Sequence, residues 1–192
     1  MVNLTRIYTR TGDGGNTRLG DMSEVAKTDL RVAAYGDVNE ANAHLGVAVV
    51  LGGLDDDVQT VLGRMQNDLF DLGADLATPV VENPEFPPLR VREEEVQRLE
   101  EWCDHYNETV EPLRSFVLPG GTAGSALLHV ATTAMRRSER STWAAMQVHA
   151  DSMNPIAVRY LNRASDLLFI LARHANRHVG DVLWKPGGER GD

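Results

Sequence analysis

The chain has 192 residues, and its 19 Lys and Arg against 28 Asp and Glu give a formal net charge of −9 at pH 7. One domain is the simplest organisation for this length, and the acidic balance argues against a general binder of nucleic acids or membrane surfaces. The only cysteine is Cys103, so neither an intrachain disulfide nor a cysteine-cluster metal site can form. The longest apolar run, 45–51, is too short to span a bilayer, and residues 1–10 lack the apolar stretch of a signal peptide, so we expect a cytoplasmic protein.

A glycine-rich segment near the start of the chain, IYTRTGDGGNTRLG at 7–20, contains four glycines, three threonines and two arginines. Glycines let backbone N–H groups approach an anion closely, and Thr hydroxyls and Arg guanidinium groups supply further donors. This composition favours a phosphate site. No Walker A string occurs in the chain, however, and Thr17 stands where a dinucleotide fingerprint needs its third glycine. A glycine-rich surface turn is therefore an equally good interpretation of the composition alone.

Apolar residues then recur at helical spacing in five segments, which predict five long helices. The first helix starts near Leu30 and ends at Gly52, because glycine commonly follows the last residue of a helix. The second opens on the three aspartates 55–57, whose carboxylates favour the positive end of the helix dipole. It stops before the proline-rich segment 78–91, which we expect to be irregular.

The remaining three helices are marked by equally local signals. A third helix is predicted over 93–110, where it opens on three glutamates, and a fourth over 123–146, after the chain break at 116–122. The fifth is predicted to begin at Asn154–Pro155, an N-cap residue followed by proline at the first helical position, and to run to Gly180.

These elements predict an all-α fold, a five-helix bundle in a single domain over 1–192. Helices of about 20 residues span about 30 Å, so they would pack side by side over 28–180. An irregular loop over 1–27 precedes the bundle, and an irregular tail over 181–192 follows it. No segment shows the alternation of a strand.

The fourth predicted helix carries the densest positive cluster of an otherwise acidic chain, MRRSER at 135–140. Arg136 and Arg140 are four residues apart and share a helix face, whereas Arg137 lies about 100° around the axis. Glu139 could hold one guanidinium in a fixed orientation. A solvated basic face with weak salt bridges and a site for an anion are both compatible with this pattern.

The fifth predicted helix has two polar positions on one stripe, Asn162 and Asp166. Both residue types are mildly unfavourable in a helix interior, which indicates either hydrogen bonds between helices or ligand contact. His174 and His178 are also four residues apart, a spacing that metal binding tolerates. The sequence offers no third ligand, so we interpret both as surface histidines and predict no metal site.

Taken together, six ordered motifs resemble the PduO-type ATP:cob(I)alamin adenosyltransferases over about residues 5–188. The motifs are YTRTGDGGNT, AAYGDVNEANAHLG, FVLPGGT, RRSER, YLNRASDLLF and VLWKPG. The resemblance implies a five-helix bundle that forms a homotrimer with its active sites between subunits. It also implies transfer of the 5′-deoxyadenosyl group of ATP to the cobalt of cob(I)alamin, with release of triphosphate.

The resemblance further implies which residues line the ATP site, from the loop, a following lysine, the arginine motif and the fifth helix. These residues are Thr9, Arg10, Thr11, Gly12, Thr17, Arg18, Lys27, Arg136, Arg137, Glu139, Arg140 and Asn162. Among them, Arg136 and Arg140 are expected to act in catalysis, because arginine forks compensate the charge that gathers on a leaving triphosphate.

Two further positions are assigned to the corrinoid pocket by the resemblance. Phe116 matches the aromatic residue that helps to displace the lower axial ligand of cobalt. Asn39 stands where the family usually has an aspartate that pairs with the first arginine of the fourth helix, here Arg136, across the subunit interface. The ion pair is lost with Asn39, although Asp37 or Glu40 could compensate.

The implied substrates and cofactors are ATP, Mg²⁺ and cob(I)alamin, and the implied partners are two further copies of the chain. A cobalamin reductase and an adenosylcobalamin-dependent enzyme are further candidate partners, whereas nucleic acids and membranes are not. A non-catalytic carrier or sensor of ATP or adenosylcobalamin is the alternative function, and a purely structural helical bundle is a third. A pure binder could lose Arg140 or Lys27, so the presence of both favours catalysis.

Overall fold

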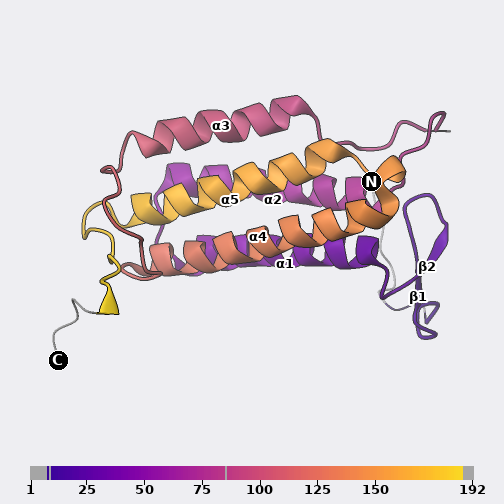
Figure 1. Cartoon of the computed structure of the whole chain (residues 1–192), viewed down its shortest axis with the longest axis horizontal. Coiled ribbons are helices and arrows are strands. Elements are labelled where there is room, and N and C mark those ends of the chain that lie inside the picture. The colour runs from indigo at the N-terminus through magenta and orange to yellow at the C-terminus, as the bar shows by residue number, and fades with distance from the viewer. Residues whose placement is uncertain (1–7, 9, 85, 188–192) are drawn as a thin grey trace.

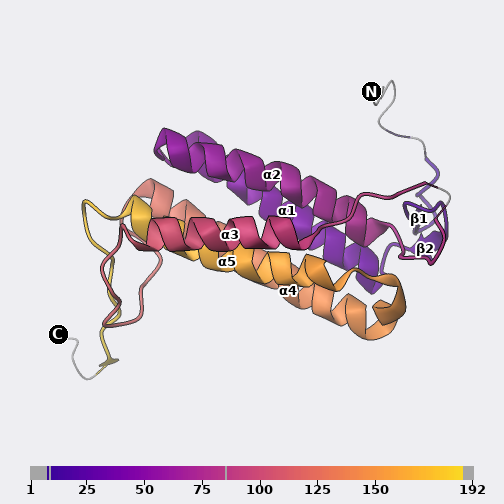
Figure 2. The same ribbon diagram turned by 90° about the horizontal axis from the view of Figure 1, so that it is seen from above.

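The computed structural model describes residue 8 and residues 10–84 and 86–187. Five long helices run alongside one another, with a small β-hairpin at one end and the C-terminal segment at the other (Figures 1 and 2). In chain order the elements are β1 (Asn16–Arg18), β2 (Glu24–Ala26), α1 (Leu30–Leu51), α2 (Asp56–Ala77), α3 (Glu93–Asn107), α4 (Ala123–His149), the 3₁₀ turn η1 (Ala150–Ser152) and α5 (Pro155–Ala175). The predicted five-helix bundle is confirmed.

The helices form one apolar core because each buries a stripe of residues at helical spacing. Helix α1 packs against both α2 and α4, α4 packs against α5, and α3 covers α5. Leu45 of α1, Leu69 of α2, Leu128 of α4 and Leu161 of α5 are all fully buried in this core. The pattern of apolar residues in the sequence therefore corresponds to real packing faces.

Side-chain caps set the starts of three helices. Asp29, Thr122 and Asn154 each accept a hydrogen bond from a backbone N–H in the first turn of α1, α4 and α5, respectively. Such caps satisfy donors that have no partner inside the helix. The predicted start of the fifth helix at Asn154–Pro155 is confirmed, with Pro155 as its first residue.

The ends of helices differ more from prediction than the starts do. Helix α5 ends at Ala175 rather than at Gly180. The cause is Asn176, whose side chain accepts from Thr122 N and donates to Gly120 O, which draws the chain out of the helix toward the start of α4. Helix α4 continues to His149, and α3 already ends at Asn107.

The N-terminal loop contains the one pair of named strands in the described residues. Strands β1 and β2 pair antiparallel, with Thr17 opposite Val25. Each strand is only three residues long, which is too short for alternation to be recognised in the sequence. The expectation of a wholly irregular loop was therefore wrong at this point.

His174 is also not the surface histidine that its spacing predicted, since only 7% of it is exposed. The Thr109 hydroxyl donates to Tyr106 O at 2.6 Å, so its oxygen is left to accept from His174 Nδ1 at 2.7 Å. The other ring nitrogen, Nε2, lies 3.5 Å from the Asp55 carboxylate. His178, by contrast, is exposed as expected.

Burial lowers the pKa of His174, and the nearby Arg177 guanidinium lowers it further, against the opposing effect of Asp55. A histidine whose pKa is lower in the folded chain than in the unfolded chain contributes stability that is complete above about pH 6.5 and is lost as the pH falls below it. His129 shows the same direction of shift, again mainly from burial.

We therefore predict that the free energy of unfolding falls between pH 7 and pH 5, and falls less in a His174→Asn variant. Asn can still donate to Thr109 but carries no titratable ring. Chemical denaturation at a series of pH values measures this, with His178→Asn as the exposed control. An unchanged pH dependence in His174→Asn would show that the buried ring does not contribute.

Candidate functional site

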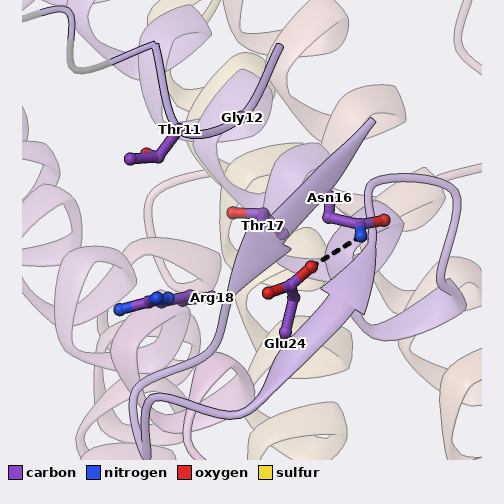
Figure 3. Close-up of a pocket in the computed structure, with 6 residues that line it drawn as sticks. All are labelled: Thr11, Gly12, Asn16, Thr17, Arg18 and Glu24. Atoms are coloured by element: carbon purple, nitrogen blue, oxygen red, sulfur yellow. Dashed lines mark hydrogen bonds between the residues drawn. The ribbon is translucent and has the colours of Figure 1, made fainter. Parts of the chain in front are cut away.

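The N-terminal hairpin borders a cavity of about 290 Å³ that is lined by polar residues and one glycine (Figure 3). The lining residues are Thr11, Gly12, Asn16, Thr17, Arg18 and Glu24. Four of them were expected from the sequence, whereas Asn16 and Glu24 were not. Asn16 donates to the Glu24 carboxylate at 2.6 Å across the two strands, and this pairing depends on a register that the sequence does not reveal.

Lys27 joins this cavity through the backbone of the glycine loop. Its N–H donates to Gly15 O at 2.8 Å, and Gly15 adopts a φ of +87° that favours glycine. A methyl group at Gly12 would lie 3.0 Å from Lys27 Nζ, so the ammonium group sits directly against the Gly12 backbone. The structure thus brings Thr11, Gly12 and Lys27 together.

The neighbouring positions of the loop are placed less completely. Arg10 is exposed and has a φ of 63°, which is uncommon for a residue with a side chain. Thr9 lies outside the described residues. Thr17 hydrogen bonds with the Tyr35 phenol of α1, and this bond partly offsets the rise in the Tyr35 pKa that burial causes. The hairpin is therefore tied to the first helix.

A second, larger cavity of about 1060 Å³ lies toward the opposite end of the bundle, where α4 begins and α5 ends. It is lined by the loop residues 113–117, the tail residues 183–186, Arg136 of α4 and Phe169 of α5. Phe116 is 78% exposed, and its ring meets Trp184 edge-on at 6.0 Å between centroids. Phe116 and Arg136, which are 20 positions apart in the sequence, thus face one cavity.

The tail that forms part of this cavity is not irregular throughout, as the sequence had suggested. Val117 and Leu183 form an antiparallel bridge, Trp184 N donates to Phe116 O at 2.8 Å, and Leu118 N donates to Val182 O at 2.7 Å. These bonds hold the exposed Phe116 in place. Trp184 was part of a recognised motif, but nothing in its local pattern indicated that it would contact Phe116.

The arginine motif is divided between two directions, as its spacing predicts. Arg140 is exposed, and its guanidinium donates to Arg136 O at 3.2 Å one turn earlier. Glu139 accepts from Asn162 Nδ2 at 3.2 Å and so links α4 to α5. Glu139 thus accepts from an amide, whereas the sequence predicts that it orients a guanidinium.

Arg137 turns toward α1 instead. It pairs with Glu40 and, at 3.5 Å, with Asp37, which also accepts a hydrogen bond from Ser141. The bond to Glu40 raises the pKa of Arg137, and the Arg137 guanidinium lowers the pKa of Glu40. Within one chain, therefore, both carboxylates that could have compensated for Asn39 are engaged by Arg137.

Asn39 itself is exposed, and its Oδ1 lies 3.8 Å from the space that a methyl group at Gly73 of α2 would fill. Its pairing with Arg136 across an interface stays a prediction. The described residues contain no group of three or more His, Cys, Asp or Glu side chains that could hold a metal ion. In the same residues, none of the helices combines the length and the apolar character that crossing a bilayer requires.

We predict that Arg137→Ala lowers the free energy of unfolding by about 0.5–1 kcal/mol, because it removes a partly exposed ion-pair network between α1 and α4. Urea denaturation of Arg137→Ala, Glu40→Gln and the double variant measures the coupling between the two side chains. If the effects of the two single substitutions simply add, the pair contributes nothing and the prediction fails.

Comparison with known proteins places this chain in a family. A family model described as Cobalamin adenosyltransferase matches residues 7–175. A Corrinoid adenosyltransferase from Mycobacterium bovis is 60% identical over 189 residues, which cover 98% of this chain and 97% of the relative. The Corrinoid adenosyltransferase of Bacillus subtilis is 39% identical over 186 residues, 94% of this chain and 92% of the relative.

Solved structures agree with this result. A variant PduO-type ATP:corrinoid adenosyltransferase from Lactobacillus reuteri, complexed with cobalamin and ATP, has a TM-score of 0.86 and 36% identity, and the match covers 94% of this chain and 100% of that chain. A second variant of that type from the same organism, complexed with ATP, has a TM-score of 0.83 at 36% identity and 94% coverage of this chain. Because the family model covers most of its length and a relative is 60% identical over nearly all of it, this chain belongs to the cobalamin adenosyltransferase family.

Proposed function

We propose that this protein transfers the 5′-deoxyadenosyl group of ATP to the cobalt of cob(I)alamin, forming adenosylcobalamin and releasing triphosphate. The observation that carries the proposal is the presence of two complementary cavities in one family fold. One is lined by polar residues of the glycine-rich hairpin, as phosphate binding requires, and the other is larger, has three aromatic residues in its lining and contains Arg136. A purely structural bundle would leave both cavities without a use.

The hairpin cavity would bind the phosphates of ATP. Gly12 and Gly15, which carry no side chain, let the backbone approach an anion closely, and Thr11 and Thr17 add hydroxyl groups. The ammonium group of Lys27, which lies against Gly12, supplies positive charge from beneath the loop. Arg10, Arg18 and Thr9 complete this half of the proposed site, as the family resemblance implies. The loop would thus act as a phosphate cradle without a Walker sequence.

Arg136 and Arg140 would act on the leaving group. The transferred carbon separates from an oxygen of the triphosphate, so negative charge grows there as cobalt attacks. Guanidinium groups held on one helix face are ready to compensate this charge without reorganising. The bond between Glu139 and Asn162 fixes the two helices at this point, which supports a role for both residues in orienting the nucleotide.

The aromatic cavity would accept the corrinoid. Because the nucleophile is the cobalt of the substrate itself, no general base is required, and the work of the protein is to align C5′ with cobalt and exclude water. Phe116 projects from a loop that the tail holds in place, which suits the proposed displacement of the lower axial ligand. The hydrogen bond from Arg173 Nε to the Asp181 carboxylate, at 2.8 Å, would help to keep the tail in place.

We further infer a homotrimer with each active site between two copies. A helix of 22 residues such as α1 or α2 is about 33 Å long, and the two cavities lie toward opposite ends of the bundle (Figure 1). The adenosyl carbon and cobalt must come within bonding distance, so the hairpin of one copy would complete the aromatic cavity of the next. Exposed apolar side chains on α1 and α4, among them Val47, Val50, Val130 and Trp143, supply surface for such contacts.

Magnesium would enter with ATP as part of the substrate. Mg²⁺ usually keeps several waters and is held by substrate phosphates with one or two protein oxygens. The hydroxyls of Thr11 and Thr17 and the carboxylate of Glu24 are oxygen ligands of a suitable kind at the hairpin cavity. We also infer a cytoplasmic protein that receives cobalt(I) from a cobalamin reductase and passes its product to an adenosylcobalamin-dependent enzyme.

We predict that Arg140→Ala slows adenosylation by roughly a hundredfold, or about 3 kcal/mol of transition-state stabilisation, because one preorganised donor is lost. The measurement is an anaerobic absorbance time course with chemically reduced cob(I)alamin, ATP and Mg²⁺. Arg159→Ala is the control, since Arg159 is an exposed α5 arginine that pairs with Glu93 of α3.

The same experiment separates the enzyme from the alternative function. Light-sensitive adenosylcobalamin formed by the wild type and by Arg159→Ala, but not by Arg140→Ala, supports catalysis. Binding of ATP or corrinoid by the wild type without any conversion would instead establish a non-catalytic carrier or sensor.

We also predict that Asn39→Asp strengthens self-association, because it restores a carboxylate opposite Arg136 in the proposed interface. Sedimentation velocity over a range of protein concentrations would show the trimer persisting at greater dilution than in the wild type. Asn67→Asp adds the same charge at an exposed position of α2 and serves as the control. Weaker association of Asn39→Asp would contradict the proposed pairing.

A further inference from the structure

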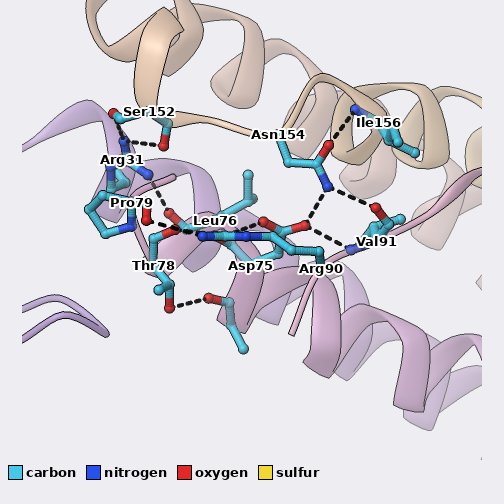
Figure 4. Close-up of polar contacts among 11 residues, drawn as sticks. Arg31, Asp75, Leu76, Thr78, Pro79, Arg90, Val91, Ser152, Asn154 and Ile156 are labelled. Atoms are coloured by element: carbon cyan, nitrogen blue, oxygen red, sulfur yellow. Dashed lines mark hydrogen bonds and ion pairs between the residues drawn. The ribbon is translucent and has the colours of Figure 1, made fainter. Parts of the chain in front are cut away.

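A polar cluster around Asp75 and Arg90 lies at the C-terminal end of α2 (Figure 4). Asp75, which is 2% exposed, accepts three hydrogen bonds with its carboxylate. Arg90 Nη1 donates to Oδ1 at 2.6 Å, whereas Val91 N and Asn154 Nδ2 donate to Oδ2 at 2.8 and 2.7 Å. This one carboxylate therefore joins α2 to the proline-rich segment and to the start of α5.

Arg90 also donates hydrogen bonds to backbone carbonyl groups at and just after the end of α2, where carbonyls have no partner inside the helix. Its Nη1 donates to Asp75 O at 2.9 Å and to Thr78 O at 2.7 Å, and its Nη2 donates to Pro79 O at 3.1 Å. A cation at this position also interacts favourably with the negative end of the helix dipole. Arg90 thereby fixes the path of the backbone as it leaves α2.

A second arginine completes the arrangement from α1. Arg31 is 2% exposed, and its Nη1 donates to Leu76 O at 2.9 Å. Its Nη2 donates to Ser152 Oγ at 2.6 Å and to Ser152 O at 3.1 Å. Burial lowers the pKa of Arg31, while the charges of Asp29 and Asp21 oppose this effect. Two guanidinium groups thus hold the carbonyls of residues 75, 76, 78 and 79.

The carbonyl between them, that of Ala77, is where the hairpin docks. Gly20 N donates to Ala77 O at 2.8 Å. A side chain at Gly20 would overlap Thr78 Oγ1, so the hairpin backbone lies directly on the end of α2. Thr17 and Arg18, which line the nucleotide cavity, come only three and two residues before this contact. The orientation of this carbonyl therefore contributes to where these two residues lie, together with the bond between Thr17 and Tyr35.

We propose that Arg90, together with Asp75 and Arg31, is a positioning residue for the nucleotide loop and thereby sets the affinity for ATP. The three side chains hold the end of α2 so that Ala77 O meets Gly20 N, and the hairpin keeps its cavity open toward the nucleotide. The ATP readout of this inference rests on the proposed function. The structural readout, docking of the hairpin, does not.

A second arginine–aspartate pair, whose aspartate also lies on α2, serves as the control. Arg98 pairs with Asp68 at 2.6 Å, the same distance as Arg90 with Asp75, and the two arginine side chains are 24% and 21% exposed, respectively. The Arg98–Asp68 pair lies two turns earlier on α2 and joins it to α3, while Tyr160 of α5 also donates to Asp68. Removing Arg98 still leaves Asp68 the Arg64 guanidinium at 3.2 Å, whereas removing Arg90 takes away the cation paired with Asp75. Only Arg90 holds the carbonyls beside the hairpin.

The experiment compares Arg90→Ala with Arg98→Ala in the full-length protein. We expect Arg90→Ala to raise KM for ATP at least tenfold, with kcat at saturating ATP and KM for cob(I)alamin within twofold of the wild type. Hydrogen exchange of the amides in 10–27 should accelerate in Arg90→Ala and not in Arg98→Ala. Equal effects of both substitutions, or no effect of Arg90→Ala on either readout, would overturn the proposal.

A second pair of variants applies if Arg90→Ala fails to fold. Gly20→Ala leaves the polar cluster intact but pushes the hairpin away from Thr78, so it should raise KM for ATP and accelerate exchange in 10–27. Adding Thr78→Gly removes the overlapping atoms and should restore both values toward the wild type. Wild-type ATP affinity and exchange in Gly20→Ala would show that docking does not position the loop.

If the wild type forms no adenosylcobalamin, the proposed function fails, while the exchange comparison still decides whether Arg90 positions the hairpin.

Discussion

The C-terminal end of α2 is the point at which α1, α5, η1, the proline-rich segment and the β-hairpin meet, and buried charges make that meeting. Arg31 and Asp75 are each 2% exposed, a burial that would be costly if their polar atoms lacked partners. The bonds of Arg31 and of the Asp75 carboxylate described there all join different segments of the chain. Apolar packing aligns the helices along the bundle, but this cluster determines how its loops leave it.

The bundle then acts as a rigid spacer between two functional surfaces. Its helices hold the hairpin cavity and the aromatic cavity toward opposite ends, and loops attached to rigid ends supply most of the lining residues. A single chain thus presents two separate cavities rather than one closed pocket, which agrees with the proposed completion of each site by a neighbouring copy. The exposure of Phe116 in one copy agrees with the same proposal.

Helix geometry separates the three arginines of the motif at 135–140. Because successive residues are separated by about 100°, Arg136 and Arg140 share one face, whereas Arg137 points to α1 and is neutralised by Asp37 and Glu40. The motif thus leaves two cations on one face, where the proposed function needs them for the triphosphate, while the third ties two helices together. This division supports a smaller role for Arg137 in nucleotide binding than its place in the motif suggests.

The sequence by itself determined the five helices, the cap at Asn154 and the glycine loop, because periodicity, capping and backbone freedom are properties of neighbouring residues. It also indicated Thr11, Gly12, Thr17, Arg18, Phe116 and Arg136 through ordered motifs, and these residues line the two cavities. Only the tertiary structure decided that His174 is buried, that Trp184 meets Phe116, that Glu139 binds Asn162 and that Arg90 holds the end of α2. Each of these contacts joins different segments of the chain, so it depends on how whole helices and loops are placed in space, which no local pattern of residues records.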